Sequence, residues 1–297
     1  MNLVDRSTYL GLIGRIARVT GWRPPPNPSP PNPYLEYPVK PVPRYGQGKP
    51  PHRRLYEIID TNRTAYKHTL KSFLDLKEYF VSIPIRRPTN SEEPYWACTW
   101  LPALDIVALS SFLIINNPKT YFEIGSGFST KFARRAISHY GLRTRIVSID
   151  PSPRVEIDSI CDNIIYKPVE DVDLGIFDEL ESGDILFVDS SHRCCMNSDV
   201  TVVFLDILPR LRAGVMVEFH DIFLPSDYPL EWKERYYSEQ YMLAVYMLAE
   251  GNKFDIVMPN FFISFDKELG GILQPLWNEI ETNEVITAGA SFWIQTK

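Results

Sequence analysis

The sequence is poor in cysteine, and none of its cysteines forms a CxxC pair. A chain of 297 residues with only Cys98, Cys161, Cys194 and Cys195 is expected to have neither a disulfide framework nor a thiolate zinc site. No apolar run approaches the roughly 20 residues of a membrane-spanning helix, and charged residues interrupt the first apolar stretch, which argues against a signal peptide. We therefore expect a cytoplasmic protein without a transmembrane segment.

A long basic run is also missing, although basic charge gathers at one end. Residues 1–54 contain nine Lys/Arg and two Asp/Glu, whereas the whole chain has a net charge of -6. A basic arm thus precedes an acidic body, and nucleic-acid binding is not expected because the arm lacks a basic run. Twelve of the 25 prolines lie between Pro24 and Pro51, which predicts an extended arm.

Upstream of the prolines, apolar residues recur at helical spacing with Arg15 and Arg18 between them; they are Tyr9, Leu12, Ile13, Ile16 and Val19. The pattern predicts a cationic amphipathic helix. Such a helix packs on its own body or on a second subunit, or lies on an anionic membrane surface. A homo-oligomer formed through the arm is therefore one expectation.

From about residue 100 the chain alternates short apolar segments with amphipathic ones. Seven segments read as strands: 120–124, 145–149, 163–167, 184–189, 214–219, 254–259 and 290–296. Strand and helix alternating at this spacing predict a mainly parallel sheet with right-handed crossovers. Helices are expected over 52–80, 101–115, 130–140, 198–211 and 238–250, and the last is apolar nearly all round, which predicts burial. We divide the chain into a basic, Pro-rich and helical extension (1–95) and an α/β domain (96–297).

The residues that follow the strands are the candidate binding residues, because parallel sheets bind ligands at the carboxyl ends of their strands. Gly125 and Gly127 follow the first strand and let the backbone turn and approach a ligand. Asp150 ends the second strand, where an acid can accept both ribose hydroxyls of a nucleoside; the alternative is a helix N-cap. Thr130 stands where a dinucleotide fingerprint has its third small residue, which argues against a pyrophosphate ligand.

The runs YFEIGSGFSTKF, RIVSIDPSP, ILFVDSSHR and VMVEFHDI together resemble the class I S-adenosylmethionine-dependent methyltransferases, and in particular a bacterial branch with EIGSGxST and VDxSH motifs. The similarity covers about residues 100–297. It implies a Rossmann-like seven-stranded sheet with helices on both faces and the seventh strand antiparallel between the fifth and sixth.

By that resemblance S-adenosyl-L-methionine is the cofactor. Asp150 would hold its ribose, Glu170 and Asp171 its adenine, and Asp189 would border it. The glycine loop would hold the methionine moiety through Glu123, Gly125, Ser126, Gly127 and Ser129.

Two mechanisms remain open for the reaction. Asp189 and His192 follow the fourth strand and His220 and Asp221 follow the fifth, so their side chains should converge. In one mechanism His192 is the general base, with a pKa suited to neutral pH, and Asp189 or Asp221 orients it. In the other, Asp189, His220 and Asp221 bind Mg²⁺ or another divalent cation that activates the acceptor hydroxyl, although magnesium prefers oxygen ligands to the imidazole of His220.

We expect O-methylation of a small molecule or a sugar hydroxyl. The loop IFLPSDYPLEWKERYY after the fifth strand carries Tyr228, Trp232, Tyr236 and Tyr237, which either stack on the acceptor or pack the last helix. An NAD-dependent oxidoreductase and a non-catalytic assembly protein that keeps the fold are the alternatives.

Overall fold

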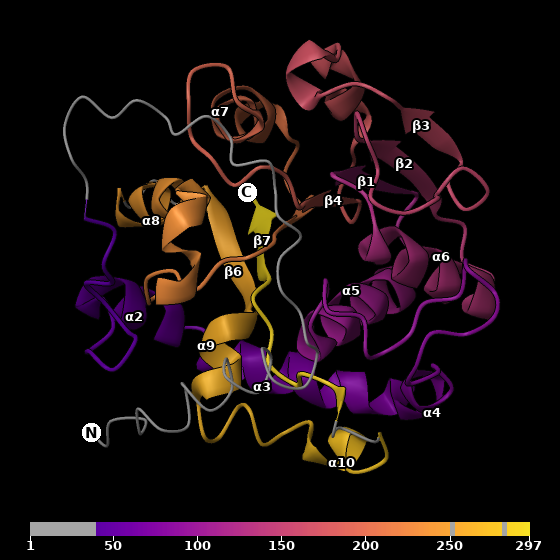
Figure 1. Cartoon of the computed structure of the whole chain (residues 1–297), viewed down its shortest axis with the longest axis horizontal. Coiled ribbons are helices and arrows are strands. Elements are labelled where there is room, and N and C mark those ends of the chain that lie inside the picture. The colour runs from indigo at the N-terminus through magenta and orange to yellow at the C-terminus, as the bar shows by residue number, and fades with distance from the viewer. Residues whose placement is uncertain (1–39, 250–252, 281–283) are drawn as a thin grey trace.

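The computed structural model describes residues 40–249, 253–280 and 284–297, which build one seven-stranded sheet of order β3-β2-β1-β4-β5-β7-β6 (Figure 1). The strands are β1 (Thr120–Ile124), β2 (Arg145–Ile149), β3 (Asn163–Ile165), β4 (Ile185–Val188), β5 (Met216–Phe219), β6 (Phe254–Pro259) and β7 (Phe292–Thr296). All pairs are parallel except those of β7, which runs antiparallel between β5 and β6. The Rossmann-like α/β fold class is confirmed, including the place of the seventh strand.

The strand ranges agree closely with the expected ones, and the differences have local causes. β3 keeps three of its five expected residues, because it lies at the edge of the sheet and pairs with β2 alone. β5 begins two residues later than expected. Gly214 has a φ of 89°, a left-handed conformation that belongs to a turn rather than to a strand.

The helices that precede the sheet are α2 (Arg53–Asp60), α3 (Arg63–Phe73), the 3-10 turn η1 (Leu74–Leu76), α4 (Lys77–Val81) and α5 (Ala103–Asn116). The buried side chains of α2–α4, such as Leu55, Tyr66 and Phe73, belong to the same hydrophobic cluster as those of the sheet. The division of the chain after residue 95 stays a prediction.

Two sides of the sheet are covered by helices. α5 packs against α6 (Phe128–Tyr140) on one side, and α7 (Asp199–Val202) lies on the other (Figure 1). The helix expected over 198–211 is helical but not uniform: α7 continues as a π-helical segment (Val203–Ile207) and a 3-10 turn (Leu208–Arg210). The short helices α9 (Asn260–Phe265) and α10 (Gln274–Trp277) were not expected.

The helix expected to be buried all round, α8 (Glu239–Leu248), is buried on one face only. Leu243, Ala244 and Met247 are buried, whereas Tyr241 and Val245 are 44% and 64% exposed. The prediction of full burial is wrong because α8 covers one flank of the molecule, and its outward face meets solvent even though its residues are apolar.

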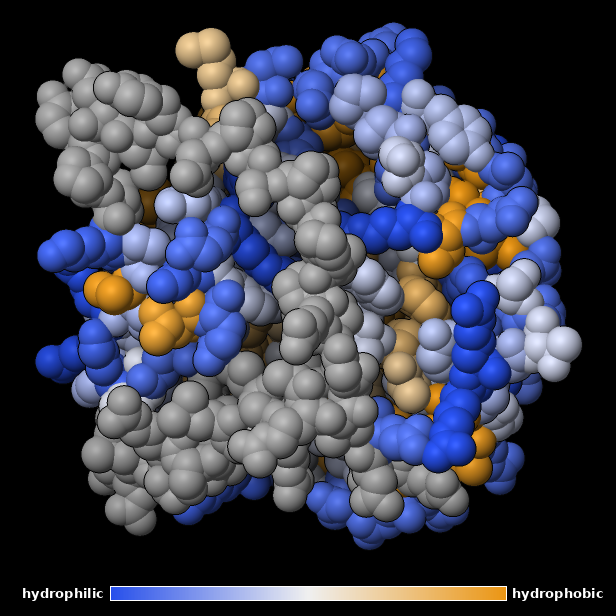
Figure 2. Space-filling model, in the orientation of Figure 1, coloured by the Kyte–Doolittle hydropathy of each residue, from blue (hydrophilic) through white to orange (hydrophobic). Residues whose placement is uncertain are grey.

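No helix in the described ranges is long and apolar enough to cross a membrane. Where described residues are visible in Figure 2, hydrophilic side chains predominate, with separate apolar spots between them. The predicted amphipathic helix over Tyr9–Val19 and most of the proline-rich segment lie outside the described residues. The described chain starts at Lys40 and is fixed soon afterwards, since the backbone N–H of Tyr45 donates to Asp227 at 2.8 Å and that of His52 to the carbonyl of Pro225 at 2.9 Å.

Candidate functional site

The carboxyl ends of the four central strands come level at one edge of the sheet. Ile124 of β1 pairs with Ile149 of β2 and with Val188 of β4, and Val188 pairs with Phe219 of β5. The residues that follow these strands therefore lie side by side. This edge holds the glycine loop, Asp150, and the segments 189–192 and 220–221.

Gly125 and Gly127 play different parts in the glycine loop. Gly125 has a φ of 80°, and a Cβ atom there would lie 1.8 Å from the carbonyl oxygen of Asp189. Only glycine fits, because the loop turns directly against the end of β4. Gly127 has a φ of 174°, which any residue adopts, and a Cβ there would meet no atom within 4 Å. The expected sharp turn therefore belongs to Gly125, while Gly127 borders open space.

The side chain of Glu123 is hydrogen-bonded to the glycine loop and is not exposed at the surface. It is fully buried and accepts hydrogen bonds from the hydroxyl groups of Tyr121, at 3.0 Å, and Thr130. Burial raises the pKa of Glu123 to about 7, against the lowering effect of hydrogen bonds from Ser129 and Thr130. The Thr130 hydroxyl also accepts the backbone N–H of Gly127 at 3.0 Å. Glu123 and Ser129 thus stabilise the conformation of the glycine loop. Because the Glu123 side chain is fully buried, it does not reach a cofactor in this arrangement.

Asp150 ties the glycine loop to the end of β2. Its two carboxylate oxygens accept the backbone N–H groups of Ser126 and Ser152, both at 2.7 Å. The second bond closes a local turn rather than capping a helix, so the N-cap alternative is wrong. An ionised carboxylate has about four acceptor positions, and a role in holding ribose hydroxyls stays a prediction.

Glu170 and Asp171 lie in the short 3-10 turn η2 (Val169–Asp171) beyond β3. Asp171 is exposed. Glu170 is half-buried, and its Oε2 atom is buried without a hydrogen-bond partner in the described structure. A buried acceptor without a partner is costly, so Glu170 is the better placed of the two to receive a donor from a ligand.

Asp189, His192, His220 and Asp221 do come together at the ends of β4 and β5. The Nε2 atom of His192 is 3.2 Å from Asp189 Oδ1 and 3.7 Å from Asp221 Oδ2, and Nε2 of His220 is 3.8 Å from Asp221 Oδ1. The Asp189 and Asp221 side chains are 26% and 20% exposed, whereas both imidazoles are buried. A ligand at this edge therefore meets the carboxylates first.

His192 does not have the pKa expected of a general base at neutral pH. Burial alone would lower the pKa of His192, but hydrogen bonds with the carboxylates of Asp189 and Glu239 raise it well above its ordinary value. Its Nδ1 atom is 2.7 Å from Glu239 Oε2. These carboxylates favour the protonated ring, whereas the mechanism expected from the sequence assumed a pKa near neutrality. The neighbouring charge of His220 and the His192 hydrogen bond outweigh burial and hold the pKa of Asp189 at about 2.

His192 and Asp221 share an uncommon backbone conformation, with φ values of 59° and 56°. Residues other than glycine rarely adopt a left-handed φ, and those that do gather at functional sites. The pattern supports a functional role for the cluster.

The sequence also allowed a divalent-cation site at Asp189, His220 and Asp221. The described residues contain no group of three or more His, Cys, Asp or Glu side chains arranged to hold a metal ion. His220 turns Nδ1 back into the protein, 3.4 Å from Glu218 Oε1 and 3.3 Å from Ser291 Oγ. The described geometry does not support a divalent-cation site at these residues, and the site stays a prediction.

Sequence reasoning missed Glu239, the first residue of α8, which is fully buried against His192. An acid directly after Ser238 at a predicted helix start was the available signal, but it is typical of helix capping. The aromatic loop packs mainly on itself and on α9. Tyr228 and Trp232 contact Phe223, which in turn contacts Phe261, and Tyr237 contacts Tyr228 and Trp232. Tyr237 also lies against His192, with ring centroids 4.6 Å apart. Tyr228 contacts Tyr241 of α8, so both expected roles of this loop stay open.

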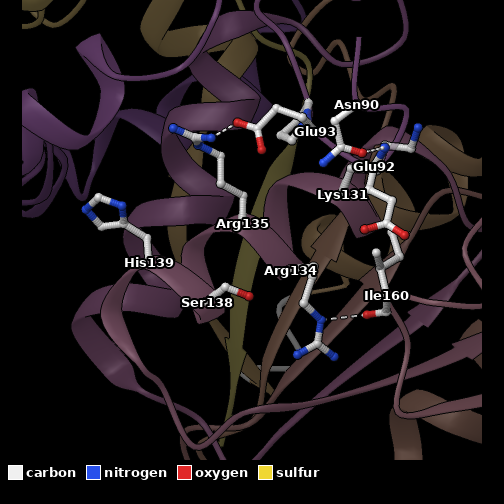
Figure 3. A pocket seen from close by; sticks show the side chains of 10 residues that line it. Asn90, Glu92, Glu93, Lys131, Arg134, Arg135, Ser138, His139 and Ile160 are labelled. Carbon is white, nitrogen blue, oxygen red and sulfur yellow. Dashed lines mark hydrogen bonds and ion pairs between the residues drawn. The ribbon is translucent and has the colours of Figure 1, made fainter. Parts of the chain in front are cut away.

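Two cavities of about 350 Å³ are found among the described residues. One follows the residues after β2 and β3 and is lined by Arg154, Asp158, Tyr166 and their neighbours. The other lies along α6, where Arg135 pairs with Glu93 and Arg134 donates to the carbonyl of Ile160 at 2.6 Å (Figure 3). Neither is lined by the Asp189–Asp221 cluster.

Residues 122–222 match the family model of a methyltransferase domain, and no curated protein matches the chain. Among solved structures, the chain is similar to the SAH-bound methyltransferase PaMTH1 of Podospora anserina, with 16% identity, a TM-score of 0.42, and coverage of 76% of this chain and 87% of that one. It is also similar to an O-methyltransferase from Bacillus cereus in complex with SAH, with 15% identity, a TM-score of 0.37, and coverage of 77% of this chain and 91% of that one. A third similar structure is the O-methyltransferase TomG of Streptomyces achromogenes, involved in tomaymycin synthesis, in complex with SAM. Its identity is 15% and its TM-score 0.41, with coverage of 75% of this chain and 95% of that one.

The matched segment begins within β1 and ends just after β5. It contains the glycine loop, Asp150 and the whole Asp189–Asp221 cluster. The part of the chain that holds the candidate site thus matches a methyltransferase domain.

Proposed function

We propose that this enzyme methylates a hydroxyl oxygen of a small molecule or a sugar. The observation that carries the proposal is the sequence of groups along the sheet edge. Open space borders Gly127 beside Asp150, and the partly exposed carboxylates of Asp189 and Asp221 follow on the neighbouring strands β4 and β5. A donor and an acceptor can thus lie next to each other, which is the main requirement of a group transfer.

The residues at the β1–β3 side fit the cofactor. A Cβ atom at Gly127 would enter the open space, so the backbone there can approach the methionine moiety. Asp150 would hold the ribose, and the unpartnered Oε2 atom of Glu170 would accept the adenine amino group. When bound, the cofactor supplies a methyl group on a sulfonium, which needs little covalent help to leave.

The residues at the β4–β5 side would orient the acceptor and take its proton. The acceptor hydroxyl would donate to the exposed carboxylate of Asp189 or Asp221. As the oxygen becomes methylated, its proton would pass to Nε2 of His192, which lies within 4 Å of both carboxylates. The resulting imidazolium is stabilised by Asp189, Asp221 and Glu239, the groups that already raise its pKa. His192 would be the proton acceptor and Asp189 the residue that aligns the hydroxyl.

Calorimetric titration with S-adenosylhomocysteine and with NAD tests the cofactor side. We expect micromolar binding of S-adenosylhomocysteine, no binding of NAD, and a loss of roughly 10- to 100-fold in affinity for Asp150→Ala, because a charged hydrogen bond is removed. Binding of NAD alone would support the oxidoreductase. Failure of a well-folded protein to bind either ligand would support an assembly protein.

The pH dependence of turnover tests the acceptor side, with methyl transfer from labelled S-adenosylmethionine measured on a panel of phenols and sugars. Because the pKa of His192 is raised, its neutral form becomes populated at a higher pH than that of an ordinary histidine, so kcat should rise as the pH increases. His192→Gln should lose this rise, with a decrease in kcat of roughly 100-fold or more. A kcat that does not change with pH in the wild-type enzyme would exclude His192 as the proton acceptor.

Location in the cytoplasm and assembly through residues 1–51 remain part of the proposal. Neither depends on the chemistry at the sheet edge.

A further inference from the structure

Glu239 places a buried carboxylate behind the proposed proton acceptor. Its side chain is fully buried at the start of α8, with Oε2 2.7 Å from Nδ1 of His192. The other oxygen, Oε1, has no hydrogen-bond partner in the described structure. A buried carboxylate is costly unless it is paired, and the pair it forms here is with His192.

The backbone around the pair is fixed as well. The carbonyl of His192 accepts the backbone N–H groups of Ser238, at 2.8 Å, and Glu239, at 3.2 Å. The backbone N–H of Cys194 donates to Ser238 Oγ at 2.8 Å. The start of α8 is thus joined to the segment after β4 by main-chain bonds, independently of the side-chain contact between Glu239 and His192.

The other contacts of the ring leave a single direction for its second nitrogen, Nε2. The Tyr237 ring lies against one face of the imidazole, with centroids 4.6 Å apart. With Nδ1 held by Glu239, only Nε2 faces Asp189 and Asp221, at 3.2 Å and 3.7 Å. If the ring turned over, Nδ1 would take that place and Nε2 would face the buried carboxylate.

We propose that Glu239 is a positioning residue, whose carboxylate holds the His192 ring so that Nε2 faces Asp189, Asp221 and the methyl acceptor. The inference rests on the proposed function for its catalytic consequence, but the orientation of the ring can be measured without turnover. A carboxylate on the far side of an imidazole selects the ring nitrogen that carries the fixed proton. Glu239 would not touch the acceptor.

The experiment uses the full chain with ¹⁵N-labelled histidine and S-adenosylhomocysteine, and records the ring signals by ¹H–¹⁵N NMR. His192→Gln assigns the His192 signals. In the wild-type protein we expect a strongly deshielded Nδ1 proton for His192. Glu239→Gln keeps an amide oxygen as acceptor and should retain a weaker form of this signal. Glu239→Leu removes the acceptor and should abolish it.

Glu218→Gln is the matched control, because Glu218 is another fully buried carboxylate beside a histidine, His220. It should leave the His192 signals unchanged. The proposal is overturned if the deshielded Nδ1 proton is missing from the wild type or unaltered in Glu239→Leu. If Glu239→Leu does not fold, a signal in Glu239→Gln that is identical to the wild type overturns it as well.

Kinetics on an acceptor from the panel give the second readout. Misorientation of the base should lower kcat roughly 10- to 100-fold in Glu239→Leu and less in Glu239→Gln, with KM for S-adenosylmethionine changed less than about twofold. A structural defect alone would change both parameters. If no acceptor on the panel is methylated, the proposed function fails, while the NMR signals still decide whether Glu239 orients His192.

Discussion

The two halves of the sheet edge are built in different ways. On the β1–β2 side, the polar groups are satisfied close by: Asp150 binds Ser126 and Ser152, and Glu123 binds Tyr121 and Thr130. On the β5 side, segments far apart in the sequence hold one another. His192 binds Glu239, 47 residues away, and the backbone N–H of Tyr45 binds Asp227, 182 residues away.

The difference separates contacts between neighbouring parts of the sequence from contacts between distant parts. The cofactor half is a short-range unit that the sequence pattern predicts. The half proposed to bind the acceptor depends on loops and on the segment around Tyr45, so it lies where the sequence pattern is least informative.

The largest effects are expected when the two glycines of the loop, Gly125 and Gly127, are substituted. Gly125→Ala would place a Cβ atom 1.8 Å from the Asp189 carbonyl oxygen and should destabilise the fold by roughly 3 kcal/mol or more. Gly127→Ala should change the free energy of unfolding by no more than about 1 kcal/mol. It should lose affinity for S-adenosylhomocysteine, because its Cβ atom enters the open space. Thermal unfolding and calorimetry measure the two quantities. Wild-type stability of Gly125→Ala, or unchanged affinity of Gly127→Ala, would contradict the roles given to the loop.

A deletion of residues 1–51 should affect the acceptor half more than the cofactor half. It removes the backbone donors of Arg44 and Tyr45 from the buried carboxylate of Asp227, at a cost of roughly 2 kcal/mol or more. A deletion of residues 1–39 keeps these bonds and serves as the control. We expect the longer deletion to change melting temperature or oligomeric mass more than affinity for S-adenosylhomocysteine. Loss of that affinity with unaltered mass and melting temperature would show that the arm has been placed wrongly.

The smallest effects should come from two matched tyrosines. Tyr121→Phe removes the hydroxyl bound to Glu123 and Tyr241→Phe the one bound to Asp227, each at 3.0 Å. Each should cost about 1 kcal/mol in unfolding free energy. Only Tyr121→Phe should also weaken the binding of S-adenosylhomocysteine, since it loosens the support of the glycine loop. Equal effects of both variants on that affinity would remove the distinction between the halves.

The sequence predicts the sheet well, because strands and glycine turns are short-range patterns. TYFEI, RIVSI and FDIVMP form strands over their whole predicted ranges, and the residues after them lie at one edge. Contacts between distant segments were not predictable in the same way. The burial of one face of α8 depends on its neighbours, and the raised pKa of His192 depends on Glu239 of that same helix.

The contact at Gly125 also limits how this region can change. The atom that a side chain there would strike is the main-chain carbonyl of residue 189, which is present whatever amino acid occupies that position. No compensating side-chain substitution at residue 189 can therefore make room. A lineage that lost this glycine would recover the loop by reversion or by rebuilding the backbone after β4, and such rebuilding would displace the carboxylate and imidazole that follow it.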